Sequence, residues 1–249
     1  MAHNYAYVRN DWEGWSAMDS TSSGAGPTGV LTPVEAERAI YIDFEGTETD
    51  PPSFLGAAWA DGDGGVRFVQ YVLEPALWPA AEAATGVCGG TMVPADWSDL
   101  AELRRIAEAE DRRLIAWSDR ERKALVDGVL DEGDRRWFDD NVLDAKPLAK
   151  RWKRRMHREV VFERDPKNRM RGRHRLDRYF GLIGYSVPKI LGPGNSAQRI
   201  RAVRGQLARH GDYAALTKTV KGKWTKALKH NWHDCNGLRE LVRVVAELG

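Results

Sequence analysis

The sequence contains few cysteines and no long apolar run, and each scarcity excludes a class of protein. Cys88 and Cys235 are too few for the disulfide framework of a small secreted domain, so we expect a reducing, cytoplasmic setting. No stretch approaches the ~18 consecutive apolar residues of a membrane span, so no membrane partner is expected. Residues 1–34 lack a basic segment followed by an apolar one, as a secretory signal would have, and are expected to form a flexible arm.

Basic residues are scarce in the first part of the chain, and acidic residues are scarce in the second. Residues 1–140 contain 12 Lys and Arg against 27 Asp and Glu, whereas residues 141–249 contain 26 against 9. The formal net charge of +2 hides this division. It predicts a polyanion-binding surface beside a cation-binding one, although attraction between the two halves of one fold could use part of the charge.

The chain is long enough to bury a full core, and residues 35–249 are expected to form one domain. Apolar patterning predicts strands at residues 39–44, 54–60, 66–73, 113–117 and 142–144. Helices are expected at residues 96–109, from 118 to between 128 and 133, and at 146–157, 176–183, 197–210 and 223–248. This order predicts an α/β fold with a mixed five-stranded sheet flanked by helices, a Gly/Pro-rich loop to about residue 94, and a basic helical insertion at about 146–222.

Two carboxylates interrupt the first predicted strand. Asp43 and Glu45 are two residues apart, so alternation sends both to one face, while Ile42 and Phe44 point to the other. Two carboxylates on one face repel each other unless a cation lies between them, which makes the pair a candidate divalent-metal site. The alternative is a strand whose solvated face is acidic.

A third carboxylate lies within an apolar stripe of the last predicted helix. At ~100° per residue, Ala227, Leu238, Leu241 and Val245 fall within about 40° of Asp234 around the helix. A buried isolated carboxylate costs several kcal/mol, so Asp234 needs a partner. That partner is either a basic side chain from the sheet or a metal ion shared with the Asp-x-Glu pair.

Three segments, in this order, resemble the exonuclease motifs of the DEDD superfamily, whose members have a ribonuclease H-like fold. The segments are IYIDFEG at 40–46, LIAWSDRERKAL at 114–125 and KHNWHDCNGLREL at 229–241. They are most similar to the ribonuclease H-like nucleases predicted in bacteria and phages. The resemblance implies a ribonuclease H-like sheet and phosphodiester hydrolysis with two divalent ions, Mg²⁺ or Mn²⁺.

The resemblance also implies the site residues. Asp43 and Glu45 match the ligands of the first motif, and Asp234 matches the aspartate of the third. Glu121 aligns with the acid of the second motif, but it also completes a capping box with the preceding Ser118, and Asp119 and Asp144 compete with it.

A histidine near the third motif is a candidate general base. His230 occupies the position where the family usually has Tyr, one helical turn before Asp234. It could equally be a surface residue that only flanks the site. The adjacent His233 is expected to point elsewhere on the helix.

The predicted helix at 146–157 begins the densest basic run of the chain. Residues 146–175 contain 13 Lys and Arg, and a stripe suited to a phosphate backbone is expected from Lys150, Arg151, Arg154, Arg155 and Arg158. Aromatic residues nearby could stack on bases or, more commonly, belong to the core; these are Trp152, Tyr179 and Trp224.

These observations and the resemblance favour a metal-dependent nuclease that hydrolyses DNA or RNA, either as a 3′–5′ exonuclease acting on a single-stranded end or as a structure-selective nuclease. The alternative is a nucleic-acid-binding module of the same fold with an impaired site, because Ser118 and His230 depart from the family pattern. A protein-interaction domain would leave the charge division unexplained.

Overall fold

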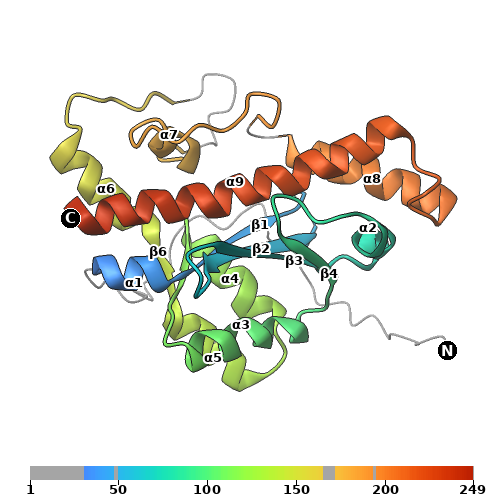
Figure 1. Cartoon of the computed structure of the whole chain (residues 1–249), viewed down its shortest axis with the longest axis horizontal. Helices are drawn as coiled ribbons and strands as arrows, with labels where there is room; N and C mark the ends of the chain where they lie inside the picture. The colour runs from blue at the N-terminus through green and yellow to red at the C-terminus, as the bar shows by residue number, and fades with distance from the viewer. Residues whose placement is uncertain (1–30, 48–49, 165–171, 193–194, 249) are drawn as a thin grey trace.

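The computed structural model describes residues 31–47, 50–164, 172–192 and 195–248, so residues 1–30 of the predicted arm lie outside it. A six-stranded mixed sheet lies between two layers of helices (Figure 1). Its strands are β1 (Ile40–Glu45), β2 (Phe54–Ala60), β3 (Val66–Val72), β4 (Thr91–Pro94), β5 (Leu114–Ala116) and β6 (Val142–Asp144). Their order is β4-β3-β2-β1-β5-β6; β2 is antiparallel to β1 and β3, and the other neighbouring pairs are parallel.

The helices surround this sheet and differ greatly in length. They are α1 (Pro33–Arg38), α2 (Trp78–Ala83), α3 (Ala101–Ala109), α4 (Asp119–Gly128), α5 (Glu132–Asn141), α6 (Ala145–Met156), α7 (Leu176–Phe180), α8 (Ser196–His210) and α9 (Lys218–Leu248), with 3-10 turns η1 (Pro75–Leu77) and η2 (Ser98–Leu100). The 31-residue α9 runs across the whole molecule (Figure 1). Within the described ranges, no helix has the length and apolar character needed to cross a bilayer.

The predicted α/β class with a mixed sheet is confirmed, but four helices and strands were missed, namely α1, α2, β4 and α5. The expected loop contains α2 and β4, so the sheet has six strands rather than five. The short β4 is mostly exposed, so its sequence has no apolar pattern typical of a strand, and it is a strand because it pairs with β3. The helix α5 buries only Phe138, so its apolar signal was too weak to recognise. The helix α1 begins at Pro33, which places the expected boundary of the arm inside a helix.

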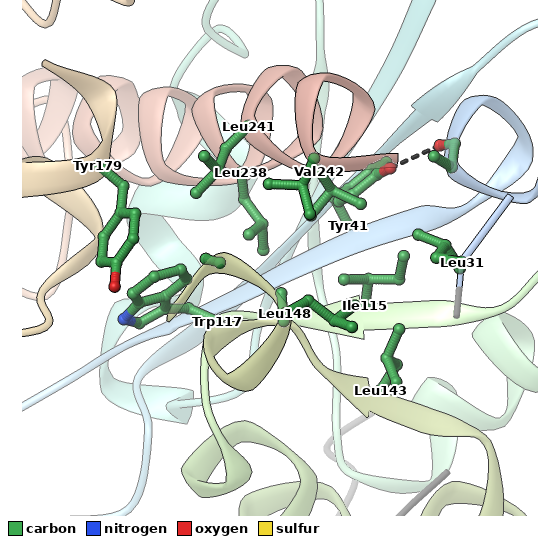
Figure 2. Close-up of a cluster of buried hydrophobic side chains, with 14 of the residues drawn as sticks. Leu31, Tyr41, Ile115, Trp117, Leu143, Leu148, Tyr179, Leu238, Leu241 and Val242 are labelled. Carbon is green, nitrogen blue, oxygen red and sulfur yellow. Dashed lines mark hydrogen bonds between the residues drawn. The ribbon is translucent and has the colours of Figure 1, made fainter. Parts of the chain in front are cut away.

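Alternation along β1 divides its side chains between the two layers. Ile40 and Ile42 join the cluster formed with α3, α4 and α5, whereas Tyr41 joins the cluster formed with α9, α1 and α6. In Figure 2, Leu238 and Val242 of α9 lie against Tyr41. The carboxylates that follow Tyr41 at two-residue intervals therefore share one face of β1, as the sequence predicted, and this face is the one covered by α9.

The aromatic residues considered for base stacking belong to the core. Trp224 is fully buried between the sheet and α8, and its ring packs edge-on against Phe54. Trp152 and Tyr179 are buried in the cluster of Figure 2. Their rings are thus committed to packing and are not available to stack on bases.

Candidate functional site

The carboxylates of β1 meet the middle of α9. The His230 Nε2 atom lies 3.5 Å from Asp234 Oδ2 and 3.9 Å from Glu45 Oε1. In the part of the chain that the structure describes, Glu45, His230 and Asp234 are the one group whose potential ligand atoms all lie within 4.8 Å of one another. Asp43 projects from the same face of β1, and Asn231 of α9 contacts it. Residues that are far apart in the sequence meet here because α9 packs across β1 and β2.

Burial and mutual repulsion raise the pKa values of all three carboxyl groups. Desolvation is the largest cause for each. The pKa of Glu45 rises to about 8, because burial and the charge of Asp234 both disfavour its ionised form. Burial, with the charges of Asp177 and Glu121, raises the pKa of Asp234 to about 7. The pKa of Asp43 is raised well above its ordinary value by burial and by the neighbouring carboxylates.

The alternative partner considered for Asp234, a basic side chain from the sheet, is not found among the described residues. The one ion-pair contact recorded there for Asp234 is with His230. The charge of Arg199 on α8 lowers the pKa of Glu45, but burial and the charge of Asp234 outweigh it. The Ser196 hydroxyl donates a hydrogen bond to Glu45 Oε1 at 3.1 Å. The cluster therefore carries excess negative charge that a cation would relieve.

A polar relay that the sequence did not reveal holds Asp43. The Asn231 Nδ2 group donates to Asp43 Oδ2 at 3.0 Å and to its carbonyl oxygen at 2.9 Å. Asn231 Oδ1 in turn accepts from Gln70 Nε2 at 2.9 Å. Asn231 and Gln70 are almost completely buried, so these bonds fix the carboxylate rigidly.

A glycine makes room for this relay. Gly56 pairs with Asp43 on one side and with Gln70 on the other, so the three residues form a row across β1, β2 and β3. A Cβ atom at Gly56 would lie 2.1 Å from Asn231 Oδ1. Only glycine lets α9 approach the sheet closely enough for Asn231 to reach Asp43.

Of the three candidates for a further carboxylate, the structure brings Glu121 nearest to the site. Its charge raises the pKa values of both Asp43 and Asp234. It also keeps the capping role considered from the sequence, since the Ser118 backbone N–H and hydroxyl donate to Glu121 Oε2 at 3.0 and 2.8 Å. The partly exposed Asp119 instead pairs with Arg122 at 2.6 Å, and Asp144 caps α6.

Asp177 on α7 is an acidic neighbour that sequence reasoning missed. Its charge raises the pKa of Asp234, and its Oδ1 atom is buried without a hydrogen-bond partner in the described structure. Phe180 of α7 packs closely over Gly237, less than one turn beyond Asp234 on α9. The segment around Asp177 carries no motif, so only this packing could have identified it.

The two histidines of α9 have different environments. Burial lowers the pKa of His230 to about 4, and its side chain is only 12% exposed. The possibility of a merely flanking surface residue is therefore excluded. His233 faces away from the carboxylates as predicted, and its Nδ1 atom lies 3.0 Å from the Tyr185 hydroxyl.

The basic residues predicted to form one stripe on α6 divide between two faces. Arg151 and Arg155 line an apolar cavity of about 360 Å³ beside Leu31 and Val245. Lys150 lies on the other face, where its charge lowers the pKa of His174, although desolvation is the larger cause.

The remaining members lie near the second face or the end of the helix. The charge of Arg154 acts on the Tyr179 hydroxyl, and Arg158 donates from Nε to the Arg154 carbonyl. Lys153 is internal: its ammonium donates to the carbonyls of His157 and Val160.

Lys146, which was not singled out from the sequence, connects the second face of α6 to the acidic centre. Desolvation is the largest cause that lowers its pKa, and the charges of Asp144 and Glu121 oppose this effect. No ion pair of Lys146 or Lys150 occurs among the described residues. Lys146 therefore lies near Glu121 and Lys150 lies near Lys146, and neither ammonium group is neutralised by a direct ion pair among the described residues.

Comparisons with known proteins do not assign a function to this chain, so the function is argued from the geometry of the carboxylate cluster. A scan of family models and searches of curated proteins and of solved structures each found no match.

Proposed function

We propose that the protein is a metal-dependent nuclease that hydrolyses phosphodiester bonds of DNA or RNA, with 3′–5′ exonuclease action on a single-stranded end. The observation that carries the proposal is the buried carboxylate cluster of Asp43, Glu45 and Asp234, whose charge lacks a Lys or Arg ion-pair partner among the described residues. Oxygen-rich sites of this kind suit Mg²⁺ or Mn²⁺.

The sheet supports a ribonuclease H-like fold. Three antiparallel strands, β1 to β3, are followed by β5 and β6, which pair parallel on the other side of β1. The three segments that resemble the DEDD motifs lie on β1, on β5 with α4, and on α9, and their acidic residues converge. This convergence is what a shared site requires, and the extra edge strand β4 lies far from it in the sheet order.

The donor set fits one divalent ion directly and leaves further carboxylates for a second. Glu45 and Asp234 would hold an ion between β1 and α9, and Asp43 and Glu121 would contribute oxygens beside it. Bound divalent ions would supply a nucleophile from water and stabilise charge on the phosphate. The protein's own part is to exclude water from the carboxylates and to hold Asp43 in one orientation through Asn231.

Cleavage assays with a matched control test the proposal. Wild-type protein with Mn²⁺ should shorten 5′-labelled single-stranded DNA or RNA, and a blocked 3′ end should stop it. Asp43→Ala should reduce the rate by ~100-fold or more, whereas Asp119→Ala, a surface carboxylate paired with Arg122, should not. Tight binding by wild type without cutting of any nucleic acid would refute the enzyme and favour the binding module.

The two faces of α6 allow a separate test of nucleic-acid binding. We expect the nucleic-acid backbone to follow Lys146, which lies near Glu121, and the neighbouring Lys150 on the same side of α6. Alanine at both should weaken binding of labelled single strands in Ca²⁺ and lower the salt slope by about 1 to 2. Alanine at Arg151 and Arg155 removes the same charge from the opposite face and should change the slope little; equal effects would contradict this path.

A further inference from the structure

We propose that His230 is a metal ligand, so that the site binds Mn²⁺ in preference to Mg²⁺. This inference rests on the metal site of the proposed function and assigns it a nitrogen donor. The sequence suggested instead a general base at His230. The geometry of its Nε2 atom relative to Glu45 and Asp234 decides between the two roles.

The Nε2 atom lies where a ligand would be placed. Its distances of 3.5 Å to Asp234 Oδ2 and 3.9 Å to Glu45 Oε1 are too long for good hydrogen bonds. Ligand atoms that share an ion at about 2.1 Å are separated by about 3.0 to 3.4 Å in octahedral or tetrahedral geometry. Small side-chain adjustments would therefore bring the three atoms onto one ion.

The backbone favours the same assignment. His230 and Asp234 are four residues apart on the long, regular α9, so both side chains project from one face over Glu45. Spacing by four residues on a helix is the arrangement by which two side chains bind one metal ion in helical metal motifs. The His230 Nδ1 atom is buried without a partner in the described structure, so no protein donor at Nδ1 forces the proton onto Nε2, and Nε2 is free to offer its lone pair to a metal ion.

A neutral imidazole changes which ion the site prefers. Mg²⁺ demands an octahedron of oxygen ligands and keeps several waters, whereas later first-row ions accept imidazole readily. In the affinity order of divalent ions Mn²⁺ is the weakest of these, but it accepts both carboxylate and imidazole. Two carboxylates and one imidazole should therefore bind Mn²⁺ at least ~10-fold more tightly than Mg²⁺.

Metal-binding measurements without nucleic acid test the inference. Titration calorimetry should show that His230→Ala weakens Mn²⁺ binding by ~10-fold or more, while Mg²⁺ binding changes little. His233→Ala is the matched control, since it removes a histidine from the same helix that bonds Tyr185 instead. Pulsed electron paramagnetic resonance of bound Mn²⁺ should show coupling to one imidazole nitrogen in wild type and in His233→Ala, but not in His230→Ala.

The outcomes separate this inference from the proposed nuclease. Equal Mn²⁺ affinities for the two histidine variants, or no nitrogen coupling in wild type, would overturn the ligand role. Circular dichroism of each variant would establish that the fold is kept. His230→Gln provides a second variant of similar volume and should show the same loss of nitrogen coupling. Mn²⁺ bound through His230 without any cleavage would support the ligand role while refuting the nuclease.

Discussion

The carboxylate cluster should make the metal-free protein less stable as pH rises above neutrality. Glu45 and Asp234 have folded-state pKa values of about 8 and 7, against ordinary values of 4.5 and 3.8. The folded protein therefore binds more protons than the unfolded chain between these limits, and the free energy of unfolding must fall as pH rises through them. His230 has the opposite effect below pH 6.5, because its folded-state pKa is lowered to about 4.

Between pH 6.5 and 8, the change in the free energy of unfolding reports on the carboxylates and not on His230. With the two folded-state pKa values above, Glu45 and Asp234 together should cost about 2 kcal/mol across this window. Urea unfolding in EDTA at pH 6.5, 7.25 and 8 measures this loss. Saturating Mn²⁺ should remove it, because a bound cation favours the ionised carboxylates.

Variants show whether the cluster causes the effect. The double variant Glu45→Gln, Asp234→Asn should lose less than half as much stability across the window, and in EDTA at pH 8 it should be more stable than wild type. Asp119→Asn, which removes a partly exposed carboxylate paired with Arg122 outside the cluster, should retain the full pH dependence of wild type. A pH dependence that is the same in wild type and in the double variant would refute the assignment of the buried negative charge.

Two further substitutions test the structural support of the site. Gly56→Ala should displace Asn231, because the new Cβ would lie 2.1 Å from its Oδ1. The substitution should lower the free energy of unfolding by about 1 to 3 kcal/mol in urea and weaken Mn²⁺ binding. Gly62→Ala is the control because it has open space around it, and an equal loss of stability in both variants would contradict the close packing at Gly56. Tyr41→Phe should cost about 1 to 3 kcal/mol by urea unfolding, because the buried hydroxyl donates to the Ala36 carbonyl at 2.5 Å; an unchanged stability would show that this carbonyl finds another donor.

The elements that carry the acidic residues could be predicted because local patterns encode them. Alternation alone sends Asp43 and Glu45 to one face of β1, and the apolar stripe of α9 turns Asp234 inward. The same periodicity identified β2, β3, β5, β6 and most helices. It failed where burial is slight, as in β4 and α5, because an element with few core contacts has a weak apolar pattern.

The existence of a buried acidic strand and a buried acidic helix can be deduced from the amino-acid sequence, because the spacing of apolar residues indicates which face of each element is buried. Which side chains complete the candidate site depends instead on how the elements pack together. Gln70 and Asp177 come from β3 and α7, and nothing in their local sequence marks them; Asn231 lies in the third motif-like segment, but only the packing of α9 on the sheet shows that it contacts Asp43. The structure also chose Glu121 over Asp119 and separated Lys150 from Arg151, because side-chain neighbours depend on how helices are rotated against the sheet.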